Sequence, residues 1–283
     1  MAIIEAESVA RSRGEAAMPE TSWWLWLSAP IVVLALFSSL VGVFGRGTYA
    51  RETANWSGQA VGQDIANLAA YVLLGVLAVA TARGSMRAYV AWIGLVAFSV
   101  YSFAIYAFAV HFGRMFLVYV AVFGLSVYAL TGALNALDRV RWRAMFGSGA
   151  PVRSTAIVLI VISGMFYLLW LSEVIPTIAS GKVPDAVRDA GLLTNPVHVL
   201  DMAVLLPAGI LAGILLLRRN NWGFALAPAV LTCFVFLGVG IVAAILVLRS
   251  RGEEAPMAVA IGVSVLTLVE SAVLVRFLGS AHQ

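Results

Sequence analysis

Residues 222–248 read WGFALAPAVLTCFVFLGVGIVAAILVL, an apolar stretch that contains no charged side chain. An α-helix needs about 20 apolar residues to cross the roughly 30 Å of hydrocarbon in a bilayer. The stretch therefore predicts a membrane-spanning helix, and similar blocks recur along the chain. We predict eight spans in all, at residues 23–45, 63–83, 87–111, 114–137, 154–177, 196–218, 222–248 and 256–277.

The composition of the whole chain supports the same fold class. Hydrophobic residues make up 62% of the 283 residues and charged residues only 11%, whereas a soluble domain is about a quarter charged. Transmembrane barrels consist of short segments with alternating hydrophobicity, and no such segments are found. We therefore predict an all-α, polytopic transmembrane helical bundle whose main partner is the lipid bilayer.

The distribution of basic residues predicts an orientation. With the N-terminus inside, 11 of the 18 Lys and Arg residues fall on the inner side and 7 on the outer side. Arg139, Arg141 and Arg143 form the densest inner cluster, as the positive-inside rule requires. We expect a bacterial inner (plasma) membrane with both termini cytoplasmic. Because the basic residues are scattered over helix ends, no nucleic-acid partner is expected.

Tryptophans at span ends are assigned to the two interfacial belts. Trp23, Trp24, Trp142 and Trp222 are expected at the inner interface, and Trp56 and Trp170 at the outer one.

An offset of about 134 residues aligns the two halves of the chain. Asp64 and Asn67 then fall on His198 and Asp201, and the loops that follow the first and fifth spans have similar predicted lengths. Four spans in each half would give a parallel 4+4 internal repeat. The predicted organisation is a disordered cytoplasmic tail at 1–22, a first four-helix half at 23–138, a basic cytoplasmic linker at 139–153 and a second half at 154–283.

Ionisable side chains inside spans are costly unless they find a partner or water, so they mark candidate sites. Several polar residues are predicted to lie near the outer ends of the spans and to converge on one outward-facing pocket. The candidate substrate-binding residues are Asp64, Asn67, Tyr101, Tyr106, His111, Glu173, His198 and Asp201. The alternative is that these groups cap helices in the interfacial zone and that the tyrosines only pack against neighbouring helices.

Glu270 lies deep in the last predicted span, with no Lys or Arg three or four positions away on its own helix. We expect it to be neutral or bonded to another helix, with Asn135 as the repeat-related candidate. A proton-linked role is one hypothesis, and a carboxyl that joins two helices is the other. The small residues of Gly209-x-x-x-Gly213 and Ala208-x-x-x-Ala212 predict close helix packing of the sixth span.

The outer polar set leaves several functions open. A small molecule or ion could be bound or translocated there, with Glu270 as a protonation switch. A metal ion such as zinc could be held by His111, His198 and Asp201, or a haem by the two histidines, in a membrane-embedded enzyme. The chain could also be an accessory or structural subunit, or assemble as an oligomer. Transport or binding is favoured over catalysis. The lack of an ATPase motif argues against the ATPase of a transporter, and the lack of Gly-x-Ser-x-Gly leaves serine hydrolase chemistry without support.

Overall fold

The computed structural model describes residues 22–282, which fold into helices without any strand. Apart from Ser22, the predicted N-terminal tail lies outside the described residues. Eight spans in this part are long and apolar enough to cross a membrane, which confirms the predicted all-α polytopic bundle. They are α2 with α3 (Trp23–Trp26, Ser28–Phe44), α4 (Ala54–Ala82), α5 (Met86–Ala109), α6 (Phe116–Ala136), α8 (Val152–Ala179), α10 with η1 and α11 (Pro196–Leu200, Asp201–Leu205, Leu206–Leu217), α12 (Asn221–Ser250) and α13 (Met257–Gly279).

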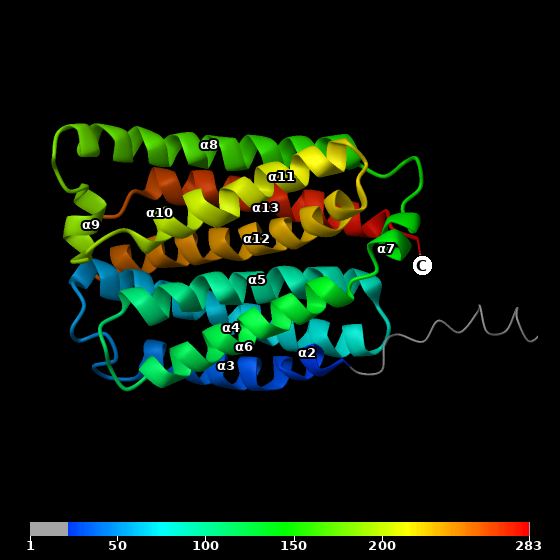
Figure 1. Ribbon diagram of the computed structural model, residues 1–283. Helices are drawn as coiled ribbons and strands as arrows, with labels where there is room; N and C mark the ends of the chain where they lie inside the picture. Colours follow the sequence, from blue (N-terminus) through cyan, green and yellow to red (C-terminus); the bar gives the residue numbers. More distant parts are fainter. Residues whose placement is uncertain (1–21, 283) are drawn as a thin grey trace, which may run out of the picture.

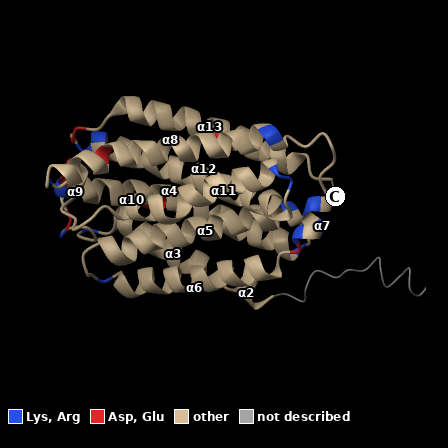
Figure 2. Ribbon diagram, turned by 45° about the horizontal axis from the view of Figure 1, so that its top comes forward, with Lys and Arg blue, Asp and Glu red and all other residues tan. Residues whose placement is uncertain are grey.

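The spans lie side by side, so the bundle has two ends (Figure 1). The C-terminus and the short helix α7 (Arg139–Ala144) lie at one end, called here the terminal end. The short helix α9 (Asp185–Ala190) lies at the other end, called here the loop end. Lys and Arg lie at both ends, and the ribbon between them is almost entirely uncharged (Figure 2). Large apolar side chains in the middle of their helices, such as Val161, Leu168 and Leu268, are exposed along the sides, where a bilayer would cover them.

Helices α5 and α12 form the centre of the bundle. Most of α5 is buried, and α12 packs against α4, α5, α11 and α13. In each set of four spans, contacts join the first to the second, the second to the third, the third to the fourth and the fourth to the first. Both sets therefore share one order of contacts, and the internal repeat stays a prediction. The loops do not match in length, however, because the connection 45–53 is much shorter than the connection 180–195.

Small residues set the closest helix contacts. Gly58 and Gly62, four residues apart on α4, face α12, and a Cβ at Gly62 would lie 2.3 Å from Cα of Ala244. On α11, a Cβ at Gly209 or Gly213 would overlap with Ser163 or Ile160 of α8, which confirms the predicted close packing of the sixth span. Only glycine lets the two backbones approach this closely.

Two predictions about the ends of the bundle are wrong. Helix α4 begins at Ala54 and not at residue 63, because Thr53 caps it by accepting a hydrogen bond from the Trp56 N–H and its first turns pack against α12. The predicted tryptophan belts are wrong in part, because Trp24, Trp56 and Trp142 are buried, whereas Trp23 and Trp222 are exposed at the terminal end. The predicted linker contains helix α7 (Arg139–Ala144), where Trp142 donates its Nε1–H to the Phe224 carbonyl of α12.

The sixth span changes its winding at Asp201. Residues Asp201–Leu205 form one π-helical turn, in which the Leu206 N–H bonds the Asp201 carbonyl. Pro207 follows directly and has no N–H to give to the preceding turn, so the ordinary α-helical hydrogen-bond ladder is interrupted here. The irregularity takes the form of a π-turn, and the Asp201 side chain is buried in the bundle interior.

Candidate functional site

A cavity of about 460 Å³ lies between the two sets of four spans. Its wall includes Asn55 and Trp56 at the loop end and reaches Phe234 and Glu270 near the middle of their helices. Glu270 is 13 residues after the start of α13, about 20 Å along the helix axis. The polar and aromatic residues that line the cavity are Asn55, Trp56, Gln59, Gln63, Tyr101, Ser102, Tyr106, Phe166, Trp170, Glu173, Asn195, His198, Asp201, Phe234, Glu254, Thr267 and Glu270.

Asp201 is the best-connected carboxyl of the cavity wall. Its Oδ1 accepts a hydrogen bond from the Tyr101 hydroxyl at 2.9 Å, and its Oδ2 accepts one from Trp170 Nε1 at 2.8 Å. These donors come from α5 and α8, so the carboxyl joins three spans across the cavity. A buried carboxyl that receives two donors is held in one orientation. The sequence predicted Tyr101 and Asp201 as site residues but placed Trp170 in the interfacial belt, which is wrong.

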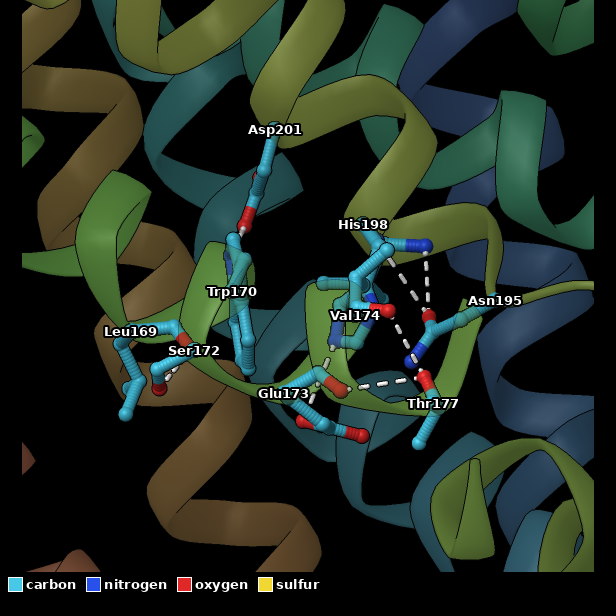
Figure 3. A network of polar contacts seen from close by, with 10 residues as sticks. Leu169, Trp170, Ser172, Glu173, Val174, Thr177, Asn195, His198 and Asp201 are labelled. Atoms are coloured by element: carbon cyan, nitrogen blue, oxygen red, sulfur yellow. Dashed lines mark hydrogen bonds and ion pairs between the residues drawn. The ribbon is translucent and has the colours of Figure 1, made fainter. Parts of the chain in front are cut away.

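His198 lies one turn before Asp201 on the same helix face (Figure 3). Its Nε2 is 3.8 Å from Oε2 of Glu173, and its ring centroid is 4.3 Å from that of Trp170. Asn195 caps the start of the helix, because its Oδ1 accepts hydrogen bonds from the backbone N–H groups of Val197 and His198. The predicted residues Glu173, His198 and Asp201 therefore line one cavity.

Asp64 lies behind the cavity wall, with only 1% of its surface exposed. Its carboxyl accepts hydrogen bonds from the hydroxyls of Tyr49 at 2.6 Å and Tyr106 at 2.9 Å. Burial raises the pKa of Tyr49, so this phenol keeps its proton and remains a donor. Asp64 was predicted to line the pocket, but it does not. It is connected to the cavity only through Tyr106, which lines the cavity and donates a hydrogen bond to it.

Asn67 is also one residue removed from the cavity. Gln63 lines the cavity and donates its Nε2–H to Oδ1 of Asn67 at 3.0 Å. Asn67 is completely buried, and its Nδ2 has no partner within residues 22–282.

Glu270 faces the deep part of the cavity, and its side chain is almost fully buried. No hydrogen bond to it is found within residues 22–282, so its carboxyl is available to a ligand or to water. The predicted partner Asn135 does not reach it, because Asn135 is exposed near the end of α6. That prediction is wrong.

His111 is not part of the cavity wall. Helix α5 ends at Ala109, and the imidazole of His111 lies in the following loop with 55% of its side chain exposed. Its Nδ1 and its backbone N–H both contact the Glu52 carboxylate, at 2.9 and 2.8 Å. The predicted metal ligands His111, His198 and Asp201 are therefore not brought together. Within residues 22–282 no three His, Cys, Asp or Glu side chains form a group suited to a metal ion. A haem held by two histidines does not fit either, because His198 lines the cavity and His111 does not.

Comparison with known proteins gives no family for this chain. No family model, no curated protein and no solved structure matches it. The interpretation of the cavity therefore depends on its own residues.

Sequence reasoning missed three contributors to the site. Trp170 is a hydrogen-bond donor to Asp201, Gln63 connects Asn67 to the cavity, and Tyr49 reaches Asp64 from the connection 45–53. Gln63 carried a usable signal, since it lies four residues before Asn67 and an amide pair at that spacing shares a helix face. Tyr49 carried none, because a loop residue has no periodicity that indicates where its side chain points.

Proposed function

We propose that this integral membrane protein binds a small organic cation in the cavity and carries it across the membrane. The observation that carries the proposal is the chemistry of the cavity wall. Four carboxyl-bearing residues, Glu173, Asp201, Glu254 and Glu270, line it together with several aromatic rings, and neither Lys nor Arg is among its lining residues. Carboxylates attract a cation by charge, and aromatic faces attract it through their quadrupoles.

The size and position of the cavity support the same class of ligand. A volume near 460 Å³ is within the range of about 300–1,000 Å³ that is typical of sites for small molecules. Trp56, Tyr101, Trp170 and Phe234 provide apolar surface for a hydrocarbon group. Asp201 and Glu270 provide the charge, because a bound cation favours the ionised form of a buried carboxyl that is otherwise neutral. An inorganic cation needs a compact shell of oxygen ligands, and the described residues include no such group of His, Cys, Asp or Glu side chains.

The arrangement of the spans supports carriage as well as binding. Transporters built from two sets of helices place the substrate near the middle of the membrane, between the sets. Here the cavity lies between the sets and reaches from the loop end to Glu270. At the terminal end, Trp142, Phe146, Phe224 and Phe277 pack against one another and close the bundle. We propose that the loop end faces outward, in agreement with the predicted cytoplasmic termini.

A matched set of probes tests the ligand class. Calorimetry with the full-length protein in nanodiscs would compare 2-phenylethylammonium with 2-phenylethanol and phenylacetate, which differ from it mainly in charge. We expect binding of the cation, at least tenfold weaker binding of the alcohol and no binding of the anion. Methylammonium and choline would show how much of the affinity comes from the hydrocarbon part.

Two variants connect binding to the cavity. Asp201→Asn and Glu270→Gln remove the charges at the two depths of the site and should each weaken cation binding about tenfold or more. Asp189→Asn and Glu253→Gln change carboxyls at the exposed loop end and serve as controls. Uptake of the labelled cation into proteoliposomes tests carriage. Equal affinity for the alcohol, or unchanged binding in both cavity variants, would refute the proposal. No binding of any probe would refute it as well and would favour an accessory subunit.

A further inference from the structure

A second hollow, of about 1060 Å³, lies along the side of the bundle toward the terminal end. Its apolar part is formed by Val32 and Leu36 of α3 and by Val72, Val76 and Val79 of α4. The three α4 valines each expose more than half of their surface. They lie in the part of α4 that is nearer the terminal end, so this groove, called here the lateral groove, faces one leaflet of the bilayer.

The end of the lateral groove is basic. Arg83 and Arg141 line it beside His282, and no Asp or Glu is among its lining residues. Within residues 22–282 neither arginine forms an ion pair, although arginine is charged at all physiological pH values. The first turn of α5 begins at the same place, at Ser85 and Met86. The N-terminal end of a helix favours an anion, so it adds to the positive potential of the two arginines.

The dimensions of the groove match one leaflet. From Val72 to Arg83 is 11 residues of α4 and its cap, a rise of about 17 Å along the axis. Half of the roughly 30 Å hydrocarbon core is about 15 Å. An acyl chain beside the valines would therefore bring its headgroup to the level of the arginines.

We propose that the lateral groove binds one anionic phospholipid from the leaflet at the terminal end. An acyl chain lies along Val72, Val76 and Val79, and the phosphate is held by Arg83 and Arg141. Arginine suits this role because its planar guanidinium binds phosphate oxygens through two parallel hydrogen bonds. Lipid is the occupant that the position favours, because the apolar part opens to the bilayer and the charge complements an anionic headgroup. This site is separate from the cavity, so it does not depend on the proposed transport function.

Headgroup selectivity provides the first test. The full-length protein would be transferred to nanodiscs that contain phosphatidylcholine with or without phosphatidylglycerol of the same acyl chains. Native mass spectrometry then counts the retained lipids. We expect preferential retention of one phosphatidylglycerol, reduced about fivefold by Arg83→Gln and about as much again by Arg141→Gln. Arg153→Gln changes an exposed arginine at the same end outside the groove and should have no effect. Retention without headgroup preference, or unchanged retention in the double variant, would overturn the proposal.

Photocrosslinking identifies the occupant of the groove directly. A photoreactive amino acid in place of Val76 would be activated in native membranes and the adduct identified by mass spectrometry. A phospholipid adduct is the expected result. An adduct with a second copy of the chain, with another protein or with residues 1–21 would show that something else covers the groove and would overturn the proposal. Gly75→Leu adds a control for the acyl part, because a Cβ there meets only Val32 at 3.8 Å and a longer side chain would fill the groove. It should lower retention of both lipids.

Discussion

Gly42→Ala is expected to destabilise the protein because Asp64 occupies the space of the new methyl group. A Cβ at Gly42 would lie 1.7 Å from Oδ2 of Asp64 and 2.9 Å from the Tyr49 hydroxyl. The carboxyl cannot move freely, since Tyr49 and Tyr106 both bond it and it is almost completely buried. Relieving the overlap requires Asp64 to move by more than about 1 Å, which stretches both hydrogen bonds beyond useful length.

The size of the effect follows from the bonds that are lost. Each hydrogen bond to a buried carboxyl is worth about 1–2 kcal/mol, and leaving the group unsatisfied adds about 1–3 kcal/mol. Alanine favours a helix over glycine by up to about 1 kcal/mol, which offsets part of the loss. We expect a net destabilisation of about 3 kcal/mol. Gly124→Ala on α6 is the matched control, because its Cβ would meet nothing within 4 Å. It should be neutral or slightly stabilising.

The assay is reversible unfolding in mixed micelles, followed by tryptophan fluorescence, in a double-mutant cycle. If the overlap with Asp64 causes the loss, Gly42→Ala should cost less than about 1 kcal/mol in an Asp64→Ala background. The reasoning is refuted if Gly42→Ala is as stable as Gly124→Ala. It is also refuted if the full cost persists without the Asp64 carboxyl.

Three further predictions concern the packing, the cavity wall and the Tyr49 phenol. Gly62→Ala should lower the free energy of unfolding by about 1–3 kcal/mol in the same assay, because its Cβ would overlap with the Ala244 backbone and push α4 away from α12. If Gly62→Ala is as stable as Gly124→Ala, this contact is contradicted. Trp170→Phe removes the Nε1–H donor to Asp201, so it should lower stability by about 1–2 kcal/mol and weaken cation binding. Trp26→Phe is the control, because Trp26 is mostly exposed, and it should have neither effect. Burial raises the pKa of Tyr49 above its ordinary value of 10.0. Above about pH 10 the phenol is therefore ionised in the unfolded state and still protonated in the folded state. The unfolded state then binds fewer protons, so raising the pH favours unfolding. The stability difference between wild type and Tyr49→Phe should therefore be constant below about pH 9 and fall by about 1.4 kcal/mol per pH unit above pH 10; a difference that stays constant to pH 11 would contradict the burial of this group.

The spans could be predicted from the sequence because the bilayer imposes a long apolar stretch on each of them. The start of α4 could not, since residues 54–62 include Asn55, Ser57 and Gln59 and lack the hydropathy of a span. These turns are helical because they pack against α12 and line the cavity instead of facing lipid. Hydropathy reports contact with lipid, so it fails where the end of a helix borders an internal polar space.

The candidate site was predictable in part for a related reason. His198 and Asp201 were identified because polar groups in a span are costly, and both lie in the cavity wall. Trp170 and His111 were misplaced because a residue near a span end can face lipid, water or the bundle interior. Which of these it faces depends on the exact end of the helix and on its rotation. Neither quantity is encoded in the apolar pattern alone.

The polar residues at matching positions of α4 and the sixth span have different surroundings. We therefore expect the first group to contribute mainly to stability and the second mainly to ligand binding. In the proposed repeat, Asn67 on α4 corresponds to Asp201, and Asp64 corresponds to His198. Helix α4 packs along α12 through Gly58 and Gly62, whereas the sixth span touches α5 mainly through α10, which leaves room for the cavity.

The carboxyl of the first half is thus enclosed by Tyr49 and Tyr106, and that of the second half borders open space. Asp64→Asn should therefore lower stability more than it lowers affinity for a cation, and Asp201→Asn should do the reverse. Parallel losses of stability and affinity in both variants would show that the two carboxyls act as one unit, and the cavity would then have no separate binding wall.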